Sequence, residues 1–95
     1  MNRLQLLSPA DLQEALAEYL HTQRKKQKLS RAALAERSGV PAPTLKKFEL
    51  TGQISLRQLL LLWQCLDDLG RLHALTQPQT NKTTEPRTLD EVLNS

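Results

Sequence analysis

Aromatic residues, glycine and cysteine are all scarce in this 95-residue chain, and each shortage narrows the range of possible folds. One tryptophan, one tyrosine and one phenylalanine leave leucine to dominate the apolar residues. With three glycines and no runs of β-branched residues, the sequence offers little for strands, so we expect an all-α fold. The single Cys65 cannot form an internal disulfide, and we interpret it as a small core residue rather than a nucleophile.

Long apolar runs are also missing. The run LLLLW covers only five residues, far too few for a helix that crosses a membrane. The N-terminal stretch MNRLQLLS has too short an apolar part to be a signal peptide, so we expect a cytoplasmic protein. A chain of this length forms one small domain with a modest buried fraction, and oligomerisation would help to stabilise it.

Groups of chemically active residues are lacking as well. One cysteine and two distant histidines, His21 and His73, do not form a set of metal ligands. No Ser/His/Asp or Cys/His grouping has sensible spacing, and no glycine-rich loop follows a strand. Asp67 and Asp68 are adjacent and would point in different directions on a helix, as in a helix cap. We therefore expect no enzyme activity, no cofactor and no metal.

The most informative stretch that is present is 29–52, LSRAALAERSGVPAPTLKKFELTG. It predicts a helix over about 31–38, a tight turn and a second helix over about 42–50. Ser30 is a good N-cap, and Gly39 tolerates the left-handed conformation that ends a helix. Ala35 is small where the two helices cross. The buried side of this unit is expected to contain Leu34, Val40, Leu45 and Phe48.

Positive charge is concentrated in this part of the chain. Residues 21–47 contain eight Lys or Arg and one acid, a net charge of +7, whereas the rest of the chain carries −4. Such a run usually forms a solvated face. Because these bases flank a helix–turn–helix pattern, we interpret them as a phosphate-binding surface.

A helix is predicted on the N-terminal side of this unit. Ser8, Pro9 and Asp11 are typical of a helix start, and the helix should run to about Lys26. Its buried stripe is expected to contain Leu12, Leu16, Tyr19 and Leu20.

Two more helices are predicted after residue 52. Ser55 should cap one over about 56–66, and Asp67 or Asp68 the other, which extends through Leu72 and Leu75. The core side of the first should contain Leu56, Leu59, Leu60, Trp63 and Leu66.

Leu61 and Leu62 do not fit this stripe. A helix that is apolar nearly all round is buried on more than one side, so we expect both leucines in a homodimer interface. The alternatives are that they are exposed, or that the C-terminal tail covers them.

The chain is expected to divide into a domain over residues 1–76 and a short flexible tail over residues 77–95. The segment TQPQTNKTTEPR, residues 76–87, lacks apolar residues and contains two prolines, as linkers do. Thr88 then caps LDEVL, with Glu91 at the capping-box position. Leu89, Val92 and Leu93 would form the apolar side of a short docking helix.

From about Leu12 to Leu75 the chain resembles the small helix-turn-helix repressors of the phage-repressor and XRE type. The segments LAERSGV, TLKKFELTGQISL and LRQLLLLWQCLDDLGRL are closer to HipB-type antitoxins, which pair with HipA-type kinase toxins. The resemblance implies a five-helix, phage-repressor-like domain. It also implies a homodimer that binds a palindromic operator in double-stranded DNA, represses its own operon and holds a HipA-like kinase toxin in a complex.

The resemblance also assigns roles to individual residues. Ser30 and Arg31, at the start of the predicted helix 31–38, would grip phosphate. Arg24 would form a salt bridge with Glu49. The exposed side of the next helix would enter the major groove with Ala42, Pro43, Thr44, Lys46 and Lys47.

The chain departs from the family pattern at the start of that helix. Ser, Gln or Arg are common where this sequence has Pro41, Ala42 and Pro43. These residues can still make apolar contact with thymine methyl groups. More of the recognition of the DNA sequence would then depend on Lys46, Lys47 and DNA shape. The alternative is a protein-interaction adaptor with this fold and weak DNA affinity, against which the charge of +7 argues.

Overall fold

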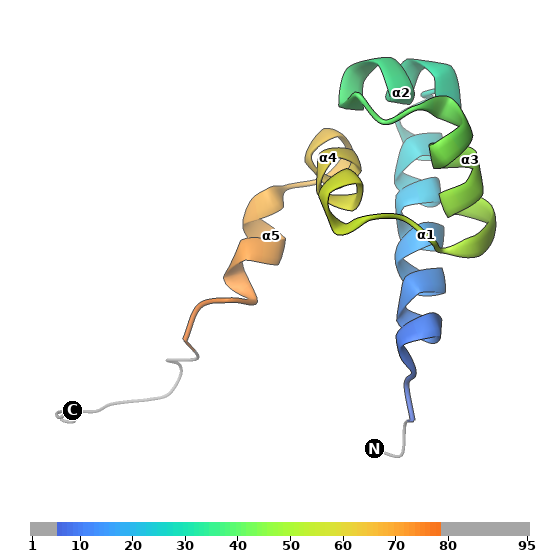
Figure 1. The fold of residues 1–95 in the computed structure, drawn as a ribbon. Coiled ribbons are helices and arrows are strands. Elements are labelled where there is room, and N and C mark those ends of the chain that lie inside the picture. Colours follow the sequence, from blue (N-terminus) through green and yellow to red (C-terminus); the bar gives the residue numbers. More distant parts are fainter. Residues whose placement is uncertain (1–5, 79–95) are drawn as a thin grey trace, which may run out of the picture.

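Five helices make up the part of the chain that the computed structural model describes, residues 6–78 (Figure 1). Their bounds are α1 Pro9–Lys26, α2 Arg31–Ser38, α3 Ala42–Thr51, α4 Leu56–Leu66 and α5 Leu69–Ala74. No strand occurs within residues 6–78, so the predicted all-α class is confirmed for them. The terminal helix predicted after Thr88 lies outside this range.

Side-chain caps explain where four of these helices begin. Ser8 accepts a hydrogen bond from the N–H three residues later, at 3.0 Å, and Asp11 returns the bond in a capping box. Ser30 and Ser55 accept equivalent bonds at 3.0 and 3.2 Å. These three predicted caps are confirmed. Asp68, rather than Asp67, caps α5 through a bond of 2.9 Å from the N–H of Gly70.

Left-handed glycines end α2 and α3. Gly39 and Gly52 both have φ of 80°, a backbone conformation that costs other residues free energy. The prediction for Gly39 is therefore confirmed. Gly52 has a second constraint, because a Cβ there would lie 3.1 Å from the backbone of Gln13 in α1. The end of α3 thus lies so close to α1 that a side chain at Gly52 would push against the α1 backbone.

The first four helices pack around one core. α1 and α2 each contact both α3 and α4, and α2 lies across one end of the group (Figure 1). The buried apolar residues are Ala17, Leu20, Leu34, Val40, Leu45, Phe48, Leu62, Trp63 and Leu66. The four residues predicted for the buried side of α2, the turn and α3 are all in this core.

Two leucines predicted for the buried side are exposed, and one leucine that did not fit the predicted core stripe is buried. Leu12 is 48% exposed, because the first turns of α1 project beyond the other packed helices (Figure 1). Leu56 is 70% exposed, whereas Leu62 is completely buried at 0%. α4 is apolar on most of its surface, so its sequence period did not determine which side faces the core.

A polar cluster fixes the direction in which α5 leaves this core. The guanidinium of Arg71 donates hydrogen bonds to the hydroxyl of Tyr19 at 2.9 Å and to the carboxylate of Asp67 at 2.8 Å. Tyr19 also donates to Asp67, and Trp63 donates to the carbonyl of Asp68 at 2.9 Å. α5 is therefore tied to α1 and α4, although it extends away from them (Figure 1). Within residues 6–78, no helix combines the length and apolar character needed to cross a membrane.

Candidate nucleic-acid interface

The outer face of α3 is a continuous exposed stripe. Leu45 and Phe48 are buried on the inner side and fix the rotation of the helix. The stripe follows the spacing i, i+3, i+4, i+7, i+8, which is one side of an α-helix. Its members, all exposed, are Pro43, Lys46, Lys47, Leu50 and Thr51. We call this set the α3 stripe.

The predicted groove residues fall into two groups. Pro43, Lys46 and Lys47 are exposed on the α3 stripe, whereas Ala42 and Thr44 are half-buried at its edge. Pro41 stands at the N-cap position without a side-chain hydrogen bond, so the start of α3 lacks a side-chain cap. The lysines are therefore the polar side chains best placed along this face.

A buried carboxylate connects α3 to α1. Arg24 donates to Glu49 through Nε at 2.7 Å and Nη2 at 3.1 Å, so the predicted pair is confirmed as a two-bond salt bridge. The Glu49 side chain is only 3% exposed. Nη1 of Arg24 also donates to the carbonyl of Leu29 at 2.8 Å, which holds the loop between α1 and α2.

Two further side chains reach the same carboxylate, which the sequence did not indicate. Nε of Arg31 donates to Oε1 of Glu49 at 2.8 Å, and Nδ1 of His21 lies 3.2 Å from the same oxygen. We call Glu49, Arg24, Arg31 and His21 the Glu49 cluster. It joins α1, the start of α2 and α3, and so fixes the α2 N-terminus relative to the α3 stripe.

The environment of Glu49 favours its charged form. Burial tends to raise the pKa of its carboxyl group. Hydrogen bonds from Arg24, Arg31 and His21, together with the positive charge of Arg24, outweigh burial, and the pKa lies below its ordinary value. The carboxylate therefore stays ionised near neutral pH and neutralises the buried Arg24.

The two residues predicted to grip phosphate lie together at the start of α2. The Ser30 hydroxyl accepts from the N–H of Ala33, and its own hydrogen is free to donate elsewhere. Arg31 is anchored to Glu49 by Nε, yet 37% of its side chain is exposed. Arg31 is thus held in place by Glu49, and part of its side chain faces solvent.

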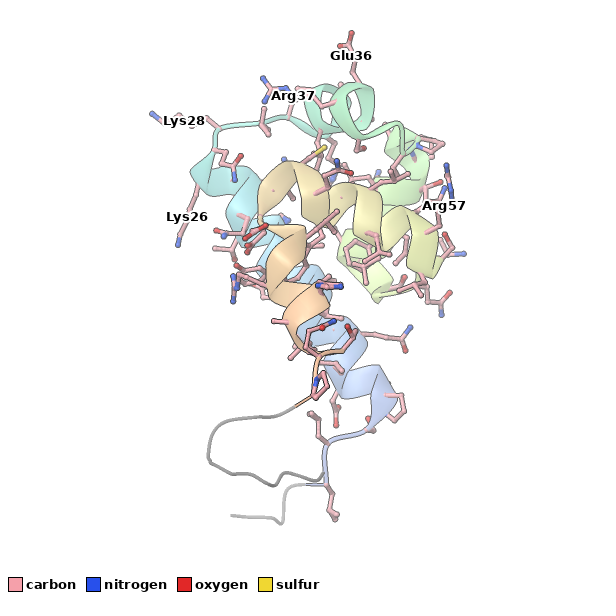
Figure 2. The ribbon with its side chains drawn as sticks, turned by 90° about the vertical axis from the view of Figure 1, so that its left-hand side faces the viewer. Lys26, Lys28, Glu36, Arg37 and Arg57 are labelled. Atoms are coloured by element: carbon pink, nitrogen blue, oxygen red, sulfur yellow. The ribbon has the colours of Figure 1, made fainter. Side chains whose placement is uncertain are left out.

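Other bases project into solvent around this region. Figure 2 shows Lys26 at the end of α1, Lys28 in the turn that follows, Arg37 on α2 and Arg57 at the start of α4. Arg57 lies outside the basic run 21–47, so charge counting missed it. Leu50 was also missed, although it is 71% exposed and follows Pro43, Lys46 and Lys47 in helical spacing.

The two leucines predicted for a dimer interface differ in position. Leu62 fills the core of its own chain and offers no surface to a second subunit. Leu61 is half-buried and packs against the core from the outer part of α4. Leu56, at the start of the same helix, exposes more apolar surface.

Within the described residues, no group of three or more His, Cys, Asp or Glu side chains is arranged to hold a metal ion. No protein-family model, curated protein or solved structure matches the chain.

Proposed function

We propose that this protein is a repressor that binds a specific double-stranded DNA sequence through a helix–turn–helix unit made of α2 and α3. The observation that carries the proposal is the α3 stripe, which contains two exposed lysines. Leu45 and Phe48, buried on the opposite side of α3, hold the helix in this orientation. A helix of this kind fits the major groove of B-DNA. The Glu49 cluster supports the same conclusion, because it fixes the angle between α3 and the N-terminus of α2.

Different residues of the unit would have different tasks. Lys46 and Lys47 approach base edges, with guanine O6 or N7 as the acceptors. Leu50 and Pro43 present apolar surface to thymine methyl groups, which compensates for the scarcity of hydrogen-bonding groups at the start of α3. Ser30 and Arg31 bind phosphate, where the backbone N–H groups of α2 and the helix dipole favour an anion.

The protein would act as a two-fold homodimer on a palindromic operator. In such a complex the two recognition helices lie about 34–36 Å apart, one turn of DNA. The exposed Leu56 and the half-buried Leu61 give α4 apolar surface for this contact, at two places about 140° apart around the helix.

A second part of the proposal rests on the resemblance of LAERSGV and TLKKFELTGQISL to HipB-type antitoxins. The repressor would also bind and restrain a HipA-like kinase toxin encoded beside it. Co-expression with that kinase is expected to give a stable complex and to relieve growth arrest. A neighbouring kinase that neither binds the chain nor is restrained by it contradicts this part.

One observation favours another function, a protein-interaction adaptor. Pro41 and Pro43 supply no hydrogen-bonding side chain where α3 starts. An adaptor would retain the fold and bind DNA weakly without sequence preference.

Titration with DNA distinguishes the two functions. The full chain is titrated with a duplex from the region upstream of its own coding sequence, and with a scrambled duplex of the same composition, at two salt concentrations. The repressor is expected to prefer the upstream duplex and to lose affinity steeply as salt rises, because bound phosphates release counterions. Equal affinity for both duplexes with little salt dependence would support the adaptor instead.

A further inference from the structure

An apolar groove lies between α4 and α5, away from the α3 stripe. Its volume is about 510 Å³, and its lining residues are Leu60, Leu69, Gly70, Leu72, His73 and Thr76. α5 has six residues and none of them is buried. A helix this short depends on tertiary packing, and the contacts of Arg71 and Leu72 leave every residue of α5 at least partly exposed. The groove is therefore expected to have an occupant beyond residues 6–78.

We propose that the occupant is the C-terminal segment of the same chain, residues 88–93, folded back onto α5. Leu89, Val92 and Leu93 have the spacing i, i+3, i+4, so on a helix they form one apolar side. Three aliphatic side chains match the three leucines, Leu60, Leu69 and Leu72, that supply the apolar lining of the groove. Thr88 supplies the N-cap that such a short helix needs.

The connection between groove and segment is long enough. Thr76 is itself a lining residue, so the chain leaves the domain at the edge of the groove. Residues 79–88 can span at most roughly 33–36 Å when extended. α5, with six residues, is only about 9 Å long. The segment can therefore return along the whole of α5 without strain in the linker.

Tethering favours this segment over a second copy of the chain as the occupant. A segment joined by a short linker has an effective concentration of order millimolar at its own groove. A second copy at micromolar concentration would need much greater affinity to compete. The proposal leaves Leu61 available for the dimer, since Leu61 is about 100° around the helix from the groove residue Leu60. Leu56 does not line the groove.

Nuclear magnetic resonance on the full chain tests this inference. In the double variant Leu89→Asp/Leu93→Asp, the methyl resonances of Leu69 and Leu72 are expected to shift. Amide exchange in α5 should quicken by about tenfold or more, because the groove loses its apolar cover. The matched control is Thr83→Asp/Thr84→Asp, which adds the same charge in the linker and should leave both readouts unchanged.

Contacts between methyl groups provide the direct evidence. Nuclear Overhauser effects from Val92 to Leu69 or Leu72 within one molecule support the proposal. The same effects seen only between differently labelled molecules would show that a second copy supplies the occupant, and would overturn it. Equal behaviour of both double variants, with no contact to Val92, would show an empty groove and would also overturn it.

Discussion

Glu49 is the residue on which the relative placement of the first three helices depends. Its carboxylate accepts two hydrogen bonds from Arg24 and one from Arg31, while His21 lies against the same oxygen as Arg31. Arg24 is itself buried. Removing the negative charge would leave this arginine without a counter-ion in the core, a change that costs more than the intact pair contributes.

The variant Glu49→Gln is therefore expected to lose roughly 3 kcal/mol of unfolding free energy, the lower end for a broken buried pair because glutamine keeps one acceptor oxygen. The pH dependence should change as well. Since the pKa of Glu49 is lower in the folded protein, its contribution is present above the pKa of the unfolded glutamate, about 4.3, and is lost as pH falls through the folded pKa.

Urea denaturation between pH 2.5 and 7 measures both effects. The wild type should lose stability over the acid range, and Glu49→Gln should give a flatter curve. Some slope should remain, because hydrogen bonds also lower the pKa of Asp11 and Asp67. Glu36→Gln, an exposed change on α2, serves as control (Figure 2). If both variants behave alike, the Glu49 cluster does not stabilise the fold as argued.

Arg31 provides the second prediction at this scale. Arg31→Ala should weaken binding to every DNA sequence by a similar factor and reduce the salt slope by roughly 1, since it removes the proposed phosphate contact. Arg37→Ala removes an exposed arginine at the other end of α2 and is the matched control (Figure 2). A larger loss on one DNA sequence than on others would assign base reading, not phosphate binding, to Arg31.

Part of the Glu49 cluster could be predicted from the sequence. The pair of Arg24 and Glu49 was predicted because the family resemblance aligns both positions. Arg31 and His21 were not placed in the cluster. Whether three side chains meet at one carboxylate depends on how three helices cross, and spacing along the chain does not contain that information.

At the scale of elements, local chemistry determined the helix boundaries well. α1, α2 and α4 have the bounds predicted from Ser8, Ser30 and Ser55, and α3 ends only one residue later than expected. Caps act through bonds over two or three residues, so they can be read from sequence. The rotation of α4 about its own axis could not be predicted from the sequence, because its leucines cover more than one side of the helix. Leu62 was therefore predicted for an interface and lies in the core.

The two glycines that end helices give a prediction at this scale. Gly39→Ala should cost about 1 kcal/mol, the penalty for a left-handed alanine. Gly52→Ala should cost more, because its Cβ also meets the backbone of Gln13. Gly39→Asn should be milder than Gly39→Ala, since asparagine tolerates this conformation. Thermal and urea unfolding check the order. Equal costs at both glycines would mean that α1 and the end of α3 are not in close contact.

For the whole molecule, the charge distribution and the overall class were predictable, whereas the contacts between elements were not. The basic run 21–47 predicted that the phosphate-binding surface would lie on the part of the chain that forms α2 and α3. The groove beside α5 could not be predicted, because it depends on the Tyr19 and Arg71 contacts that direct this helix. Association of two copies into a dimer is also a property of the whole molecule.

The proposed dimer predicts a specific sedimentation result. Wild type should sediment as a dimer at micromolar concentration. Leu56→Asp should shift it toward monomer without unfolding it, because an acidic residue is favourable in the first turn of a helix. Leu7→Asp, a change at a similarly exposed leucine outside α4, should remain dimeric. A monomeric wild type, or two variants that sediment alike, would reject a dimer through α4.

The central claim is that the α3 stripe reads DNA sequence, and one comparison tests it most directly. Lys46→Ala/Lys47→Ala and Lys26→Ala/Lys28→Ala each remove two exposed lysines, but only the first pair lies on the stripe. Affinity for the upstream duplex and for its scrambled version is measured for both variants at one salt concentration.

We predict that the Lys46 and Lys47 variant loses roughly 1–3 kcal/mol on the upstream duplex for each lysine that contacts a base, together with most of its preference over the scrambled duplex. The control variant should weaken both duplexes equally and keep the preference. If the preference survives without Lys46 and Lys47, or disappears without Lys26 and Lys28, the α3 stripe is not the surface that reads the DNA.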